Sequence, residues 1–356
     1  MPTLNRRDCL AALAALTALA APALVRGAAA RCTLAAAWDD EAGHHIGLLA
    51  ESAGALRVVA STDVPTRAHG LLWENGGTLL AVARRPGDWL MRWHPTRRTV
   101  QRAWAEPDRS FNGHVLASRD GRTLYTPQTD LDTGAGLIGV RDANSLEQFD
   151  EWPSHGLDPH ALLFDAQGRL LVANGGIPTQ SETGRAKRGL DRMDASLVRL
   201  DATANGRLLG QWRLDDARLS LRHLARQGRH VGIALQAEHD DEQRRAAAPV
   251  LALFDGSALR LTEPAQPLAG YGGDIAAWRD GFAVACPRAG GIALWRAGGR
   301  WAGFIALASG CALASGAGGV WAGGAGQALA LKGPPRSVAL PAMRLDNHWV
   351  ALSDEI

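Results

Sequence analysis

The sequence predicts an all-β fold of one class, a seven-bladed β-propeller. The first observation behind this prediction is a repeated unit, in which a polar residue opens a short apolar strand and a turn containing Gly leads into a second apolar strand. The second is composition, since the chain has 41 Gly and 12 Trp and shows no long helical pattern. Short-strand units that recur every roughly 40 to 50 residues are typical of propeller blades.

The two clearest copies of the unit begin at His114 and His160 and turn at Gly121 and Gly168. The other copies share this opening position, although one has Asp there and another has Cys. In chain order, the opening positions are His69, His114, His160, His223, Asp274, Cys311 and His348. Because repeat folds grow by adding units, we expect residues 31–356 to form a single propeller domain.

A third observation concerns the closure of the ring. The last copy begins at His348 and has no chain left to complete it. Three strand-like runs near the N-terminus, residues 34–38, 45–50 and 56–61, lack an opening histidine. We therefore expect the last blade to combine these N-terminal strands with the C-terminal strand, which would remove the exposed sheet edges.

Residues 1–30 have the features of a signal peptide. Arg6 and Arg7 precede an apolar run over residues 11–25, and Ala28–Ala30 offers a small-residue cleavage site. The run is too short to anchor the chain in a bilayer. The paired arginines favour the twin-arginine route, with an ordinary secretory signal as the alternative. We expect a soluble periplasmic protein with no stable membrane anchor.

Charge and cysteine content restrict the partners and the chemistry. A net charge of +2 argues against nucleic-acid binding. After removal of the signal peptide, Cys32, Cys286 and Cys311 remain, which allows at most one disulfide, and the sequence does not assign it. No nucleophile elbow, HExxH motif or phosphate loop is present, so no catalytic residue can be named and enzymatic activity stays open.

Three segments depart from the regular repeat. Residues 174–194 form a polar, glycine-containing insertion, which we expect over one face of the ring. Residues 238–245 are mixed in charge and favour a solvated loop over a cation site. Residues 129–136 begin like a calcium loop but lack the third carboxylate and the distal glutamate, so we predict a hairpin turn there.

The repeated histidines are the main candidate for function. The innermost strand of each propeller blade lines the central channel, so equivalent positions face one axis. Imidazole suits copper, iron and zinc, and Asp and Cys are also metal-ligand types. The alternative is a structural role, in which each histidine hydrogen-bonds neighbouring backbone. The candidate metal ligands are His69, His114, His160, His223 and His348.

Only a subset of these histidines can bind one ion, because a first-row metal takes about four to six ligands. The preferred subset is His114, His160 and His223, which lie on consecutive blades, with His69 or His348 completing the set. Binding should weaken below about pH 6, where imidazole protonates and competes with the metal.

Charged residues flank several of these histidines. Arg67 and Arg222 are candidate cofactor-binding residues, and Asp158 and Asp346 precede two other histidines. The four side chains are consistent with an ion-pair collar that orients the imidazoles. They are equally consistent with binding of an anionic ligand, or with solvated positions at the entry of each strand.

Several motifs resemble the DUF1513 family of exported bacterial proteins, most densely from Arg67 to Leu224. They are FNGH (111–114), DGRTLYT (120–126), SHGLDPH (154–160), VANGGI (172–177), SLRHL (220–224) and DNH (346–348). The resemblance implies a propeller, and partners that are imelysin-like and di-haem periplasmic proteins encoded in iron-linked clusters. Those neighbours favour copper or iron over zinc as the bound ion.

Three classes of function follow from these observations. The first is a periplasmic metal-binding accessory protein with a histidine-lined channel, acting in iron or metal handling. The second is a metal-dependent oxidoreductase or hydrolase, because a metal held by imidazoles can activate water or pass electrons. The third is a protein-interaction scaffold with structural histidines. Metal content separates the first two from the third.

Overall fold

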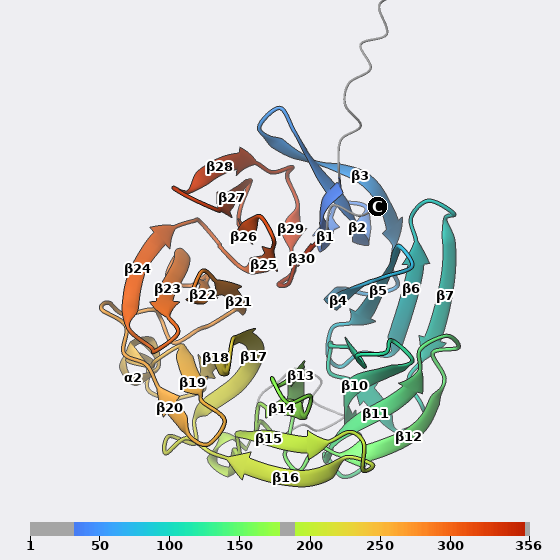
Figure 1. Ribbon diagram of the computed structural model, residues 1–356, viewed down its shortest axis with the longest axis vertical. Coiled ribbons are helices and arrows are strands. Elements are labelled where there is room, and N and C mark those ends of the chain that lie inside the picture. Colours follow the sequence, from blue (N-terminus) through green and yellow to red (C-terminus); the bar gives the residue numbers. More distant parts are fainter. Residues whose placement is uncertain (1–31, 179–188, 353–356) are drawn as a thin grey trace, which may run out of the picture. The chain divides into compact units, whose positions relative to one another are not determined.

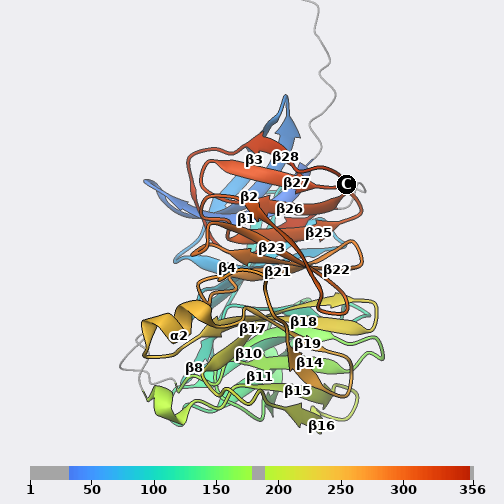
Figure 2. The same ribbon diagram turned by 90° about the vertical axis from the view of Figure 1, so that its left-hand side faces the viewer.

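A computed structural model describes residues 32–178 and 189–352 of the chain. Strands β1 to β30 form mainly antiparallel sheets that succeed one another around a central axis (Figure 1). Seen from the side, the sheets stack against one another like blades (Figure 2). The predicted class, an all-β propeller, is confirmed. The expected signal peptide lies outside the described residues.

Five of the blades are separate sheets, four with four strands and one with five. In four of them, consecutive strands of the sequence pair as neighbours from the channel outward, and in the five-stranded sheet both β8 and β9 pair with β10. The first of these blades contains β4 (Ala68–Glu74), β5 (Thr78–Ala83), β6 (Trp89–His94) and β7 (Thr99–Trp104), and the second contains β8 (Arg109–Phe111), β9 (Leu116–Ala117), β10 (Thr123–Asp130), β11 (Gly136–Asp142) and β12 (Gln148–Pro153). The third contains β13 (Pro159–Phe164), β14 (Leu170–Asn174), β15 (Ser196–Asp201) and β16 (Arg207–Trp212), and the fourth contains β17 (Leu219–Gln227), β18 (His230–Ala237), β19 (Leu251–Phe254) and β20 (Leu259–Leu261). The fifth contains β21 (Asp274–Trp278), β22 (Gly281–Cys286), β23 (Gly291–Arg296) and β24 (Trp301–Ala306).

The remaining strands form one nine-stranded mixed sheet. Its two halves are joined by a single parallel bridge between Ala339 and Ala55, so the sheet is consistent with a propeller of six or seven blades. One half contains β25 (Ala312–Gly316), β26 (Gly319–Gly323), β27 (Gln327–Leu331) and β28 (Arg336–Ala339). The other contains β1 (Cys32–Asp40), β2 (Gly43–Ser52), β3 (Ala55–Asp63), β29 (Arg344–Leu345) and β30 (Val350–Ala351).

The two ends of the described chain meet in this sheet. Strand β1 pairs with β29 at Trp38 and Leu345 and with β30 at Ala35 and Val350. Each expected N-terminal strand run falls within one of β1, β2 and β3. The C-terminal strand is interrupted, because residues 346–349 lie between β29 and β30.

The core lies between neighbouring blades. One cluster packs Leu171 and Leu197 of the blade β13–β16 against Leu221 and Ile233 of the blade β17–β20. The middle strands are covered on both faces, and β22 is buried along its whole length. A strand that is covered on both faces requires a continuous run of apolar residues. In the outermost strands, exposed and half-buried side chains alternate instead. The burial between blades therefore fixes the innermost strands around the channel.

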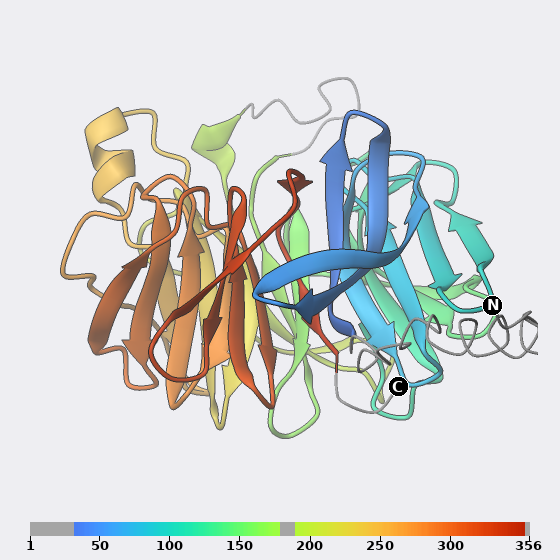
Figure 3. The ribbon, with the colours of Figure 1, turned by 90° about the horizontal axis from the view of Figure 1, so that it is seen from above.

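The irregular segments sit at the faces of the ring. The 3-10 helix η3 (Leu190–Arg192) and the short helix α2 (Glu242–Ala247) project from the same face (Figure 3). The loop expected over residues 238–245 was therefore wrong in part, because the Asp241 carboxylate accepts the Arg244 backbone N–H at 2.6 Å and caps a helix there. Neither helix is long and apolar enough to cross a membrane, and this holds for every helix of the described residues.

The predicted hairpin at residues 129–136 is confirmed. Thr129 of β10 faces Gly136 of β11 in an antiparallel pair. One carboxylate oxygen of Asp130 accepts the backbone N–H groups of Asp132 and Thr133, at 3.0 and 2.9 Å. This aspartate is consequently engaged in the turn itself.

Candidate metal centre

Five imidazoles from different parts of the ring meet in the central channel. Neighbouring ring centroids lie between 4.4 Å (His223 and His348) and 5.9 Å (His69 and His223) apart. His69, His160 and His223 are buried, and His114 and His348 are half-buried. We call this group the histidine cluster; it consists of His69, His114, His160, His223 and His348.

A β-bulge brings three of these side chains to the axis. Between Ala68 and Leu71, strand β4 has two residues where its partner β5 has one. The same irregularity occurs in β13 at His160 and in β17 at His223. A bulge adds a residue to one strand, bends it and re-aims its side chains. This is why each histidine points out of the regular alternation and toward the axis.

His114 and His348 reach the cluster through longer interruptions. His114 lies between β8 and β9, and His348 lies between β29 and β30. His348 has a left-handed backbone, with φ of 70°, and Gly113 before His114 has φ of 91°. Such conformations are unusual for residues with a side chain, so the surrounding packing determines them.

The two copies without a histidine differ in structure as well. Strand β21 pairs with β22 in unbroken register from Asp274 onward, and β25 pairs with β26 in unbroken register after Cys311. Neither residue belongs to a group of close metal-ligand atoms in the described residues. Asp274 still reaches the histidine cluster, because its Oδ1 lies 2.9 Å from Nδ1 of His348.

Two of the imidazoles are held by buried carboxylates. Nδ1 of His69 lies 2.6 Å from Oδ1 of Asp346, and Nδ1 of His348 lies 2.9 Å from Oδ1 of Asp274. Asp274 also accepts the backbone N–H of Leu313 at 2.8 Å. A carboxylate on one ring nitrogen fixes the orientation of the ring and leaves the other nitrogen free for a metal. Asp274 therefore supports a candidate ligand.

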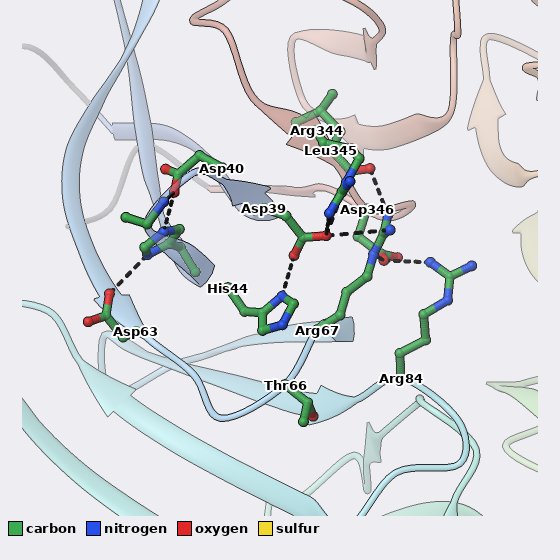
Figure 4. Close-up of polar contacts among 12 residues, drawn as sticks. Asp39, Asp40, His44, Asp63, Thr66, Arg67, Arg84, Arg344, Leu345 and Asp346 are labelled. Atoms are coloured by element: carbon green, nitrogen blue, oxygen red, sulfur yellow. Dashed lines mark hydrogen bonds and ion pairs between the residues drawn. The ribbon is translucent and has the colours of Figure 1, made fainter. Parts of the chain in front are cut away.

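Asp346 is the centre of a charged network at the junction of the chain ends (Figure 4). It is fully buried, and its second carboxylate oxygen contacts Arg67 Nε and lies 2.6 Å from Arg84 Nη1. Although burial raises the pKa of Asp346, His69 and the two arginines lower it far below its usual range. Arg67 also lies 3.5 Å from Asp39. The predicted cofactor-binding residue Arg67 thus holds the carboxylate that orients His69.

Several ring nitrogens of the cluster have no hydrogen-bond partner. A structural histidine satisfies its nitrogens with neighbouring polar groups, because a buried unpaired nitrogen costs free energy. Four nitrogens here are buried and unpaired among the described residues. They are His114 Nε2, His160 Nδ1, His223 Nδ1 and His348 Nε2. This pattern fits a bound cation, which would accept these lone pairs.

The nitrogens form two overlapping sets of three. His69, His114 and His160 offer atoms within 4.8 Å of one another, and so do His69, His223 and His348. His69 belongs to both sets, whereas the sequence argument gave it a secondary place. The preferred set of His114, His160 and His223 is not one of these groups, because neighbouring copies in the sequence do not determine which nitrogens face each other.

Burial shapes the protonation of the cluster. Desolvation lowers the pKa of His69 from 6.5 to about 3, against the attraction of Asp346. Desolvation, reinforced by repulsion from neighbouring imidazoles, also lowers the pKa of His114, His160 and His223 well below 6.5. Burial raises the pKa of the Cys311 thiol to about 12. The imidazoles are therefore neutral near pH 7, as metal ligands must be, and the Cys311 thiol is protonated.

These shifts predict acid sensitivity of the metal-free protein. Below pH 6.5 the four histidines bind protons in the unfolded chain but stay neutral in the folded one, so the free energy of unfolding should fall as pH decreases toward about 3. The slope is at most about 1.4 kcal/mol per pH unit for each histidine. Urea unfolding at pH 7.5 and 5.0 should show a larger loss for wild type than for His114→Ala/His160→Ala. Equal losses would contradict the expectation. The expected weakening of metal binding below about pH 6 stays a prediction.

Arginines border the cluster on one side. Arg222 Nη1 lies 2.8 Å from Asp158 Oδ2, and Arg85 contacts the other oxygen of Asp158. Asp158 and Asp346 are both buried, so the solvated reading of these residues was wrong. The pairs connect different blades, as a collar requires. The sequence argument missed Arg84 and Arg85, whose only signal was an adjacent pair at the end of a strand.

Two cavities reach the cluster from opposite ends of the channel. Along β17, Arg222 borders one of about 180 Å³, while Leu224 and Arg226 border the other, of about 460 Å³. His223, which lies between them, borders both. The histidine cluster therefore lies between an arginine-lined cavity and a larger cavity.

A cluster of imidazoles with four buried, unpaired ring nitrogens in the channel of an all-β propeller defines a propeller with a candidate metal centre. The chain belongs to the DUF1513 family, described as "Protein of unknown function", whose model matches residues 62–352. The resemblance seen in the sequence is confirmed. No curated protein matches the sequence.

Solved structures share the architecture at low identity. A putative 6-phosphogluconolactonase from Bacteroides fragilis superposes with a TM-score of 0.61 at 10% identity, covering 91% of this chain and 99% of that one. A streptogramin B lyase gives 0.55 at 13% identity, with 77% and 83% covered. A nidogen/laminin complex gives 0.51 at 10% identity, with 91% and 99% covered. At such identities the likeness concerns the fold alone.

Proposed function

We propose that this protein is a metal-binding accessory protein that holds a copper or iron ion in its histidine cluster and acts in metal handling. The observation that carries the proposal is the set of four buried ring nitrogens without partners. Neutral imidazoles suit copper, iron and zinc alike, and the iron-linked neighbours implied by the family resemblance favour the first two. In a scaffold with structural histidines, we expect most buried ring nitrogens to have hydrogen-bond partners.

Elemental analysis of the purified mature protein, followed by titration with copper and iron salts, tests this proposal. The expected result is about one tightly bound ion per chain, since the two sets of three share His69. A protein that binds neither copper nor iron above the level of a histidine-free propeller would overturn it.

We further propose that the protein works in the periplasm after export by the twin-arginine route, with imelysin-like and di-haem proteins as partners. The support is the Arg6-Arg7 pair before an apolar run and the family resemblance. Replacing both arginines with lysine should leave the precursor in the cytoplasm, as cell fractionation would show. Unchanged export of this variant would contradict the twin-arginine route, and co-purification from cells tests the partners.

We also propose that the ring has seven blades, with the nine-stranded sheet serving as two. The support is the single bridge between β28 and β3, against eight paired positions between β2 and β3. The last blade then combines β29 and β30 with β1, β2 and β3. Its innermost position carries His348, which places all five histidines on innermost segments.

A further inference from the structure

The arginine-lined cavity has an unusual charge. Its volume is about 180 Å³, and no acidic residue is among the described residues that border it. Within the described residues, Asp158 pairs with Arg85 and Arg222, and Asp346 pairs with Arg84. Four guanidinium groups border this one cavity. These groups belong to Arg84, Arg85, Arg222 and Arg288.

Arg222 is incompletely paired although it is buried. Its side chain is 2% exposed, and only Nη1 has a partner, Asp158. Nε and Nη2 are both buried with no acceptor among the described residues. Leaving charged N–H groups unpaired in the interior costs more free energy than leaving neutral ones. The protein therefore presents two donors of one guanidinium to an acceptor that the described residues do not supply.

Arg288 borders the same cavity, and its guanidinium group stacks on an aromatic side chain. Its guanidinium carbon is 4.2 Å from the centroid of Tyr271, a cation–π contact. It forms no ion pair with any residue of the described ranges. Stacking fixes the plane of the guanidinium and leaves its edge donors available.

We propose that this cavity binds a small oxyanion, a carboxylate or a phosphate, held by Arg222 and Arg288. The planar fork of arginine matches the paired oxygens of both groups. The volume equals about six waters at roughly 30 Å³ each, which accommodates an anion of several non-hydrogen atoms. The bound oxyanion would accept hydrogen bonds from the two unpaired Arg222 donors, which offsets the free-energy cost of burying them.

The anion would also lie beside the metal. His69, His160 and His223 border the same cavity, so one ligand reaches arginines and imidazoles together. A cation placed next to uncompensated arginines is repelled, and an oxyanion between them removes that repulsion. Anion and metal should therefore bind cooperatively. This coupling rests on the proposed metal function, whereas anion binding itself does not.

Calorimetric titration of the metal-free protein with inorganic phosphate and with citrate tests the site. Wild type should bind at least one of the two at a single site, and which one binds identifies the class of anion. Arg222→Gln and Arg288→Gln should each weaken binding about tenfold to a hundredfold, the range for a charge-assisted hydrogen bond. The matched control is Arg207→Gln, which removes the same charge from an exposed side chain of β16.

Each outcome decides one point. No binding of either anion by wild type, or equal weakening by all three variants, overturns the site. Arg288→Gln keeps the test valid if Arg222→Gln does not fold, because Arg288 has no buried ion pair. Repeating the titration with copper- or iron-loaded protein tests the coupling, which predicts a higher anion affinity. Anion binding without metal binding would contradict only the proposed metal function. An anion affinity that metal loading leaves unchanged would contradict only the coupling.

Discussion

Replacing His69 with alanine should abolish tight metal binding. His69 is the only residue shared by the two sets of three imidazoles, so its loss breaks both. Changing a residue that merely orients a ligand costs roughly 10- to 100-fold in metal affinity, and removal of the ligand itself should cost at least as much. The measurement is copper and iron stoichiometry and affinity for the full mature protein.

Two further variants sharpen this experiment. His114→Ala/His160→Ala removes two members of one set and should also bind poorly, while His94→Ala, at the end of β6 and outside the cluster, should bind like wild type. Far-UV spectra and melting curves separate metal loss from misfolding. Asp346 keeps Arg67 and Arg84 as partners in His69→Ala, so this variant should fold. If wild type binds metal no better than His69→Ala, the histidines are structural.

Deleting residues 346–356 should prevent stable folding. The deletion removes Trp349, which is 4% exposed in the core between β1 and β25, together with strand β30. It also removes Asp346 and leaves Arg67 and Arg84 without that carboxylate. Loss of a buried Trp costs about 3–5 kcal/mol, and breaking a buried ion pair costs about as much. The sum is comparable to the whole stability of a typical domain, about 5–15 kcal/mol.

Thermal and urea unfolding of the truncated protein measure this effect. A truncation after Leu352 is the matched control, because it keeps all the described strands. The expected result is an unfolded or aggregated product for the long deletion, and a melting curve for the control. A long deletion that melts like the full-length protein would show that β30 and the segment before it do not close the ring.

The architecture was predictable from local patterns. A histidine before a short apolar strand and a glycine turn after it recur along the chain, and an unfinished copy at His348 implied a partner at the N-terminus. Both depend on hydrophobic periodicity and turn residues, which a sequence displays directly. Strand β1 pairs with β29 and β30 accordingly.

The set of histidines could likewise be listed from the repeat, but its internal geometry could not. Nitrogen-to-nitrogen distances depend on bulges at His69, His160 and His223, and a bulge is set by how two strands pair, which leaves little trace in either strand alone. For the same reason the sequence could not show that Asp274 contacts His348 and holds its ring.

The sequence by itself determined a propeller whose channel carries five histidines, because periodicity and repeated positions are local properties of the chain. Only the tertiary structure decided which charges meet. Arg67 and Asp346, as well as Arg85 and Asp158, come together across blades that are far apart in sequence. Likewise, only the fold leaves Arg222 buried with two free donors. Pairing and burial are properties of three-dimensional packing, so the histidine cluster and its arginine-lined cavity became visible only in the folded ring.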